Sequence, residues 1–182
     1  MDSSIQHFPQ SNEEFGCFVD QHLDRFVRHA VSCLGNIHDA EDIVQEVILK
    51  AFRNRLELSA VSKPQNYIHR MISNSCLDHL RRNGCREAYI RRSLNDKEEE
   101  HAEPYEALLI RREENLEVQM MLDRLPPEQA EVIRLRFAAE LSFGDIAEIM
   151  SAPLTTVKSR FSYGMNKLRS GFLSKKEVYD EL

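Results

Sequence analysis

Residues 143–168 read FGDIAEIMSAPLTTVKSRFSYGMNKL, and this stretch decides the fold of the second half of the chain. Ile146 and Met150 fall at helical spacing and predict the buried side of a short helix. A Ser-Ala turn follows, and Pro153 suits the first turn of a second helix, whose Val157 would face back toward the first. This spacing is that of a helix-turn-helix, in which the second helix protrudes as a probe for the major groove of DNA.

The second helix of this motif is basic, with six basic and no acidic side chains between Pro153 and Lys176. Cations neutralise phosphates, and hydroxyl or amide groups bond phosphates or base edges. The residues that we expect to contact DNA are Thr155, Thr156, Lys158, Ser159, Arg160, Ser162, Tyr163, Asn166 and Lys167. A small helical bundle with a basic face is the alternative. Ser151 stands at the turn position where Gly is often preferred for its left-handed backbone, which Ser adopts at some cost.

The helical period continues upstream of this motif. Apolar residues recur at spacings of three and four over 15–34, which predicts an amphipathic helix that ends near Gly35. Asp39 is the expected N-cap of a second helix. A third helix is predicted over 64–82, with Pro in its first turn, and Asn83-Gly84 is expected to end or interrupt it.

No segment alternates between apolar and polar residues as a strand would, so the fold class expected is all-α. We expect two small helical domains, 10–92 and 105–172, and the second contains the helix-turn-helix. Residues 93–104 are acidic and poor in apolar side chains, which predicts a flexible linker. No role is assigned to the tail, 173–182.

The charges are segregated along the 182 residues, whose net charge is −6. Residues 63–92 carry seven basic and two acidic side chains, while 93–123 carry three basic and ten acidic ones. Two basic segments divided by an acidic one indicate two contacts with a polyanion, although solvated helix faces would look similar. No apolar run approaches the ~18 residues of a membrane span, and we expect a cytoplasmic protein with reduced thiols.

Two further runs point to a family. Residues 38–52 read HDAEDIVQEVILKAF, an apolar stripe with an acidic strip opposite, and 64–82 read PQNYIHRMISNSCLDHLRR. Together with LPPE at 125–128 and TVKSR at 156–160, they resemble a bacterial sigma factor of the extracytoplasmic-function (ECF) group. These are the minimal sigma factors, which have only the second and fourth conserved regions.

The resemblance implies roles for named residues. The helix that docks on RNA polymerase core, at the clamp coiled coil of β′, is matched by Asp39, Glu41, Asp42, Gln45 and Glu46. The part that melts and reads the minus-ten promoter element is matched by Tyr67, His69, Arg70, Asn74, Arg81, Arg82 and Arg86, with the tyrosine or histidine stacking on a base. The helix-turn-helix would read the minus-thirty-five element. The implied partners are the core polymerase (β′ clamp coiled coil and β flap), promoter DNA and an anti-sigma protein, with no membrane insertion of its own.

Catalytic chemistry is not expected. The sequence has no Gly-rich phosphate loop, HExxH or paired-cysteine motif, so we expect no enzyme activity, cofactor or metal. His22, His29 and Cys33 share one helix face, where a zinc or redox sensor is conceivable but a merely buried cysteine is the commoner case. Two other functions stay open: a stand-alone dimeric helix-turn-helix regulator, and an adaptor that binds proteins but no DNA.

Overall fold

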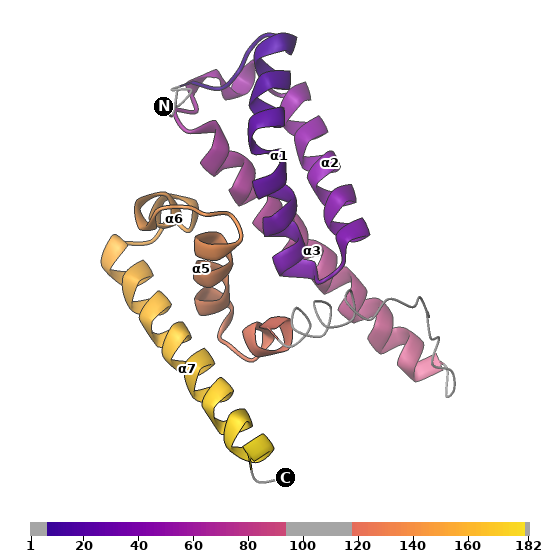
Figure 1. The fold of residues 1–182 in the computed structure, drawn as a ribbon. Coiled ribbons are helices and arrows are strands. Elements are labelled where there is room, and N and C mark those ends of the chain that lie inside the picture. The colour runs from indigo at the N-terminus through magenta and orange to yellow at the C-terminus, as the bar shows by residue number, and fades with distance from the viewer. Residues whose placement is uncertain (1–6, 94–117, 181–182) are drawn as a thin grey trace.

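The computed structural model describes residues 7–93 and 118–180. Every regular element in those two ranges is helical, which confirms the all-α expectation (Figure 1). The helices are, in order, α1 (Asn12–Leu34), α2 (Ile37–Arg53), the 3-10 helix η1 (Glu57–Ala60), α3 (Pro64–Ser93), α5 (Pro127–Phe137), α6 (Phe143–Ile149) and α7 (Leu154–Asp180).

Local sequence signals fix the ends of α1 and α2. Ser11 and Glu14 form a reciprocal capping box at the start of α1, and Gly35 ends that helix with a left-handed φ of 70°, as expected. The N-cap of α2 was predicted wrongly. Asn36 caps this helix by accepting a hydrogen bond from the His38 N–H, so Asp39 lies in the first turn, where its negative charge still favours the helix terminus.

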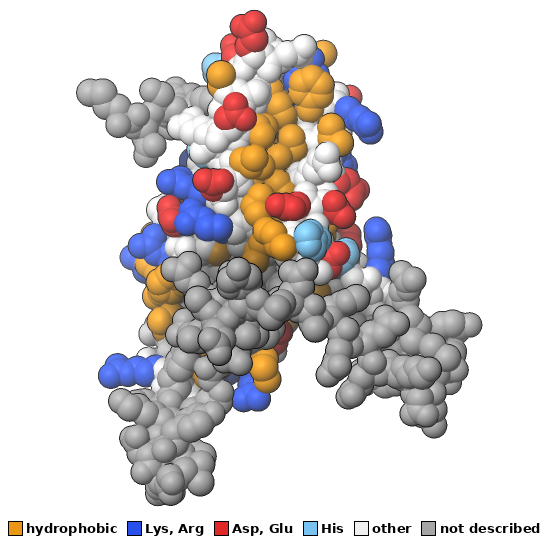
Figure 2. Space-filling view, turned by 45° about the vertical axis from the view of Figure 1, so that its right-hand side comes forward, with side chains coloured by type: hydrophobic (Ala, Val, Ile, Leu, Met, Phe, Trp, Pro, Cys, Tyr) orange, Lys and Arg blue, Asp and Glu red, His pale blue; other side chains and the backbone are white. Residues whose placement is uncertain are grey.

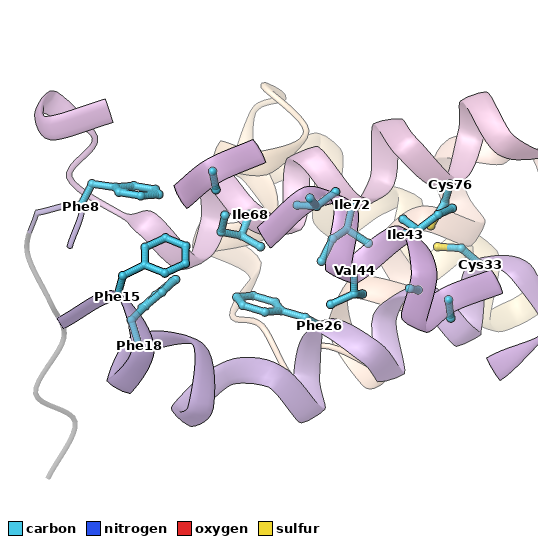
Figure 3. Packing of buried hydrophobic residues seen from close by; sticks show 14 residues of the cluster. Phe8, Phe15, Phe18, Phe26, Cys33, Ile43, Val44, Ile68, Ile72 and Cys76 are labelled. Atoms are coloured by element: carbon cyan, nitrogen blue, oxygen red, sulfur yellow. The ribbon is translucent and has the colours of Figure 1, made fainter. Parts of the chain in front are cut away.

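The core of the N-terminal domain lies where α1, α2 and α3 meet (Figure 3). Phe15, Phe18 and Phe26 from α1 pack beside Ile68 from α3 in one buried cluster. Phe8, which precedes α1, is 0 % exposed and joins this cluster, with its ring tilted against those of Phe15 and Phe18. Helical periodicity could not identify Phe8, because it lies outside any helix.

The third helix is longer than predicted. α3 continues through Asn83-Gly84 to Ser93, where we expected an end or an interruption. Glycine within a helix costs only about 1 kcal/mol relative to alanine, so one Asn-Gly pair does not have to end it. The predicted linker, apart from its first residue, lies outside the described residues, whereas 118–123 are helical.

The C-terminal domain packs α5, α6 and α7 around two adjoining apolar clusters. Val157 of α7 is fully buried against α6, as the helix-turn-helix spacing predicted. Ser142 caps α6 by accepting from the Asp145 N–H, and Ser151 adopts the left-handed backbone expected of it, with a φ of 50°. At Gly164, α7 approaches α5 so closely that an added Cβ would lie 2.8 Å from Ile133 Cδ1.

The two domains pack against each other through α3 with α6 and α1 with α5 (Figure 1). Polar contacts cross the seam: Arg134 Nε donates to the Ser32 carbonyl at 2.8 Å, and Arg28 pairs with Glu140 at 2.9 Å. Within the described ranges, no helix is long and apolar enough to cross a membrane.

Candidate functional site

The recognition helix of the helix-turn-helix is α7, and its predicted DNA-contacting side chains face solvent. Seven of those nine residues are exposed, and Thr156 and Arg160 are partly exposed. Tyr163 is the most open large apolar side chain among them, at 63 %. The opposite side of α7 supplies Val157 and Met165 to the domain core. The helix therefore presents one continuous polar and basic face.

An acidic strip lies along the outer face of α2. Glu41, Asp42, Gln45 and Glu46 are exposed, as the sequence predicted for a docking surface. Figure 2 shows acidic side chains on both sides of a hydrophobic band over the N-terminal domain. Leu49, one turn beyond Gln45 on the same face, is 47 % exposed, so the strip has an apolar neighbour that the pattern of charges in the sequence did not predict.

The fifth residue of this predicted set is placed differently. Asp39 is only partly exposed, and its Oδ2 lies 3.6 Å from His79 Nε2 of α3. This carboxylate therefore faces the junction of α2 and α3 rather than the centre of the strip.

Four of the predicted minus-ten residues lie on one face of α3. These residues follow one another after three, four and seven positions, which are one or two turns of helix, so they share this face: Tyr67, Arg70, Asn74 and Arg81. All but Tyr67 are exposed, as is Arg82 nearby. Tyr67 is half-buried and meets the Phe8 ring edge-on at 6.2 Å. The side chain of Arg86 lies outside the described residues.

His69 was wrongly assigned to this face. Its side chain is 0 % exposed, its ring lies edge-on to Phe26 at 4.9 Å, and its Nδ1 is 3.2 Å from His29 Nδ1. The helical period of about 100° per residue turns position 69 away from the face of Tyr67, Arg70 and Asn74, which is why it faces the core. Burial, followed by the charges of His29, His22 and Arg25, lowers the pKa of His69 well below its usual value. A neutral, buried imidazole cannot stack on a DNA base.

The helix-turn-helix covers the start of this α3 face. Lys63 Nζ lies 3.0 Å from Asp145 Oδ1 and 2.8 Å from Glu148 Oε2, both in α6. Asn66 Nδ2 donates to the same two carboxylates at 3.0 and 3.3 Å. A pocket between the domains is lined by residues that include Tyr67, Arg70 and Glu148. The acids of α6 therefore engage the basic segment of the other domain.

A second cluster of side chains lies between the domains, and its members differ from those predicted for the sensor site. His29 and Cys33 of α1 lie together as predicted, but the third acidic or metal-ligating group beside them is Glu131 of α5, not His22. Burial lowers the pKa of His29, but Cys33 and Glu131 outweigh it and raise that pKa above its usual value. A hydrogen bond that the Cys33 thiol donates to Cys76, and then burial, raise the pKa of Cys33 well above its usual value.

These features define a DNA-binding protein of two helical domains, with a helix-turn-helix in the second. The family model for Sigma-70 region 2 matches residues 18–85, and the one for Sigma-70 region 4 matches 121–170. The first range contains the acidic strip and most of the α3 face, and the second contains the helix-turn-helix.

Curated relatives agree with this match. The chain is 33 % identical over 157 residues to the ECF RNA polymerase sigma factor SigE of Mycolicibacterium smegmatis, covering 83 % of this chain but 58 % of that protein's length. It is 28 % identical to SigW of Bacillus subtilis, covering 86 % and 88 %, and 30 % identical to the RNA polymerase sigma-H factor of Pseudomonas aeruginosa, covering 80 % and 79 %. The chain belongs to the RNA polymerase sigma factors, in the ECF group.

Solved structures share the fold. CnrH, in complex with the cytosolic domain of CnrY, matches with a TM-score of 0.69 at 18 % identity, over 90 % of each chain. The sigma factor RpoE, in complex with the anti-sigma factor NepR from Bartonella quintana, matches with a TM-score of 0.65 at 24 % identity, over 87 % of this chain and 96 % of that one. The comparisons favour a sigma factor over a stand-alone dimeric regulator.

Proposed function

We propose that this chain brings RNA polymerase core to a specific set of promoters and assists their opening. The observation that carries the proposal is the presence, in one chain, of an exposed acidic strip on α2 and an exposed basic recognition helix, α7. A stand-alone DNA-binding regulator has no use for the first surface, and an adaptor without DNA has no use for the second. Family membership supplies the context in which both are needed.

The α2 strip is the proposed contact with the polymerase. Glu41, Asp42, Gln45 and Glu46 would meet a basic surface on the β′ clamp coiled coil, since complementary charge orients docking. Leu49, one turn beyond Gln45, adds exposed apolar area to this contact, and a buried apolar side chain gives more affinity than rim charges do. We assign Asp39 a secondary part, because its carboxylate faces His79.

The DNA contacts are divided between the domains. On α3, Arg70, Arg81 and Arg82 would hold phosphates, and the Asn74 amide can both donate to and accept from an unpaired base. Tyr67 is the aromatic side chain proposed to stack on a base, and it must first be released from the interdomain pocket. The α7 face would read the minus-thirty-five element, while other parts of the C-terminal domain would meet the β flap.

Regulation by an anti-sigma protein is part of the proposal.

Members of the family act in transcription and are not enzymes, and we infer that DNA melting here draws on binding free energy alone. The cytoplasm, where the polymerase resides, is the proposed location. We keep the domain limits at 10–92 and 105–172, with 93–104 as the tether between them.

The test is transcription in vitro by purified bacterial core polymerase on a pool of genomic promoters, with and without this protein. Transcripts that appear only when the protein is added would support the proposal, and their upstream sequences would give both promoter elements. Core binding without transcripts would favour an adaptor. DNA binding without core binding would favour the stand-alone regulator.

A paired variant tests the polymerase contact separately. Asp42→Arg with Glu46→Arg reverses the charge of the α2 strip at two exposed positions and should abolish core binding without unfolding the domain. Asp20→Arg with Glu57→Arg makes the same charge change at exposed positions of α1 and η1 and should bind core normally. Equal core affinity for the two double variants would remove the docking assignment.

A further inference from the structure

The seam between the domains contains three side chains of the types that bind metals. His29 and Cys33 come from α1 and Glu131 comes from α5, and one ligand atom from each lies within 4.8 Å of the other two. His29 is 0 % and Cys33 8 % exposed, whereas the Glu131 side chain is 21 % exposed and leaves a route from solvent. The cluster is complete only when the two domains are packed together.

The imidazole of His29 is oriented as a ligand would be. Its Nδ1 lies 3.2 Å from His69 Nδ1, and its Nε2 points to the cluster, 3.6 Å from Glu131 Oε1, without a hydrogen-bond partner among the described residues. Metal-binding histidines commonly donate their other ring N–H to a fixed acceptor, which sets the tautomer and leaves a lone pair for the metal. With His29 donating from Nδ1 to a neutral His69, Nε2 faces Cys33 and Glu131, and a metal ion would take the place of the proton on Nε2.

The other two side chains are also held in place. Ser73 Oγ of α3 donates to Glu131 Oε1 at 2.5 Å and so orients the carboxylate from the opposite domain. Cys33 and Cys76 carry their sulfur atoms toward each other between α1 and α3 (Figure 3). Arg134 contributes a nearby positive charge, but its guanidinium is bound to the Ser32 carbonyl and to Asp123. The donor groups are therefore supported by neighbours on both domains.

We propose that His29 Nε2, Cys33 Sγ and the Glu131 carboxylate bind a divalent cation of the zinc type, and that this ion fastens the C-terminal domain onto the N-terminal one. Zn²⁺ takes nitrogen, sulfur and oxygen ligands at about 2.0–2.3 Å, so ligand atoms around it are about 3.5 Å apart. The three atoms need to approach by about 1 Å, which side-chain rotation supplies. A thiolate and a carboxylate balance the charge of the ion, and the Cys33 thiol proton and the His29 Nε2 proton are released to solvent on binding. Water fills the fourth position.

This site revises the expectation that the chain binds no metal, and it does not rest on the proposed function. The test is titration of the full reduced chain with Zn²⁺ by calorimetry, with Co²⁺ as a spectroscopic probe of thiolate ligation. We expect one ion per chain and a cobalt–thiolate absorption band. Glu131→Gln and Cys33→Ser should each weaken binding by more than about tenfold, because changes even in outer-shell partners of metals cost 10- to 100-fold.

Matched variants keep the test selective. Glu128→Gln changes an exposed carboxylate on the same helix, and Cys17→Ser removes an exposed thiol from α1, and neither should alter binding. Glu131→Gln keeps an acceptor for Ser73, so it should remain folded even if Cys33→Ser does not. Zinc affinity that is unchanged in Glu131→Gln, or no binding by the natural chain, would overturn the proposal.

Small-angle X-ray scattering gives a second readout. Because Glu131 belongs to the C-terminal domain and the other two ligands to the N-terminal one, Zn²⁺ should lower the radius of gyration of the natural chain. The Glu131→Gln variant should show no such change at the same zinc concentration. Compaction of both proteins to the same extent would show that the ion acts elsewhere.

Discussion

Lys63 Nζ, just before the first residue of α3, lies 3.0 Å from Asp145 Oδ1 in α6. The pair joins the basic segment of one domain to the helix-turn-helix of the other, and Glu148 reinforces it at 2.8 Å. Two carboxylates thus neutralise a cation at the start of the basic segment, close to Tyr67 and Arg70. Under the proposed function, the closed arrangement and promoter binding would compete for the same end of α3.

Reversal of the charge at Lys63 should open the two domains. Each exposed ion pair contributes only about 0.5 kcal/mol, but Lys63→Glu replaces two attractions by two repulsions, so we expect the closed population to fall by about tenfold. The radius of gyration measured by small-angle X-ray scattering should rise. Lys50→Glu, at an exposed position of α2, is the matched control and should leave it unchanged.

Combining Lys63→Glu with Asp145→Lys and Glu148→Lys restores opposite charges across the seam. This triple variant should return toward the compact form. A triple variant as expanded as Lys63→Glu alone would show that these charges do not hold the domains together.

The same contact predicts how domain closure depends on pH. Burial raises the pKa of Asp145, but hydrogen bonds from Ser142, Asn66 and Lys63 outweigh it and lower the pKa from 3.8. Hydrogen bonds to Glu148 and Asp145 raise the pKa of Lys63 from 10.5. The Asp145 carboxylate therefore stabilises closure fully above pH 3.8, and its contribution is lost as the pH falls through its lowered pKa. The Lys63 ammonium stabilises closure fully below pH 10.5, and its contribution is lost as the pH rises through its raised pKa.

We therefore expect the contribution of the Lys63–Asp145 contact to closure to be constant across neutral pH and to weaken on the acid side. Scattering measured as a function of pH, beside circular dichroism to confirm that the helices persist, checks this. Asp145→Asn removes the titrating group, so its closure should be weaker at neutral pH and less sensitive to acid. An acid response identical to that of the natural chain would assign the effect to other groups.

Much of the fold could be predicted because the decisive signals are local. The left-handed Gly35 and the helix-turn-helix spacing each depend on a few neighbouring positions. The end of α3 could not be predicted in this way, because an Asn-Gly pair is a weak penalty that thirty residues of helix outweigh. Phe8 also escaped prediction, since a residue outside the helices enters the core for reasons of packing alone.

The candidate site residues also divide into those that the local sequence pattern places and those that only tertiary packing places. Charged and polar residues at helical spacing, such as those of α7, could be placed on an exposed face from their period. His69 was misplaced because residue type was weighed above that period. Glu131 is more than ninety residues from His29 in the sequence, so only the packing of α1 against α5 could bring the two together.

The turn of the helix-turn-helix stores a small strain at Ser151. A non-glycine residue with φ of 50° costs about 1 kcal/mol, while glycine loses more entropy on folding, so Ser151→Gly should leave stability unchanged or raise it by up to about 1 kcal/mol. Ser151→Val should lower it by about 1–2 kcal/mol, because a β-branched side chain disfavours this conformation. The free energy of unfolding in urea checks both values. Stability that is higher for valine than for glycine would mean that the turn is not left-handed.

The recognition helix should bind duplex DNA in a salt-dependent way. Lys158 is exposed and Arg160 partly exposed on the polar face of α7, so each is positioned for a phosphate. Every phosphate contact contributes about one counterion to the slope of log K against log salt. Lys158→Ala with Arg160→Ala should therefore reduce that slope by about 2 and weaken binding at low salt by at least tenfold. The measurement is fluorescence anisotropy on a duplex taken from a promoter that the protein activates, between low and physiological salt.

The matched control for this pair is Arg124→Ala, which removes an exposed cation of the same domain from outside α7 and should keep the full slope. A lower affinity with an unchanged slope in the double variant would point to base contacts instead of phosphate contacts, because base-edge hydrogen bonds release few counterions. An unchanged affinity and slope would remove α7 from the DNA interface altogether. The slope, more than the affinity, therefore decides what these two side chains do.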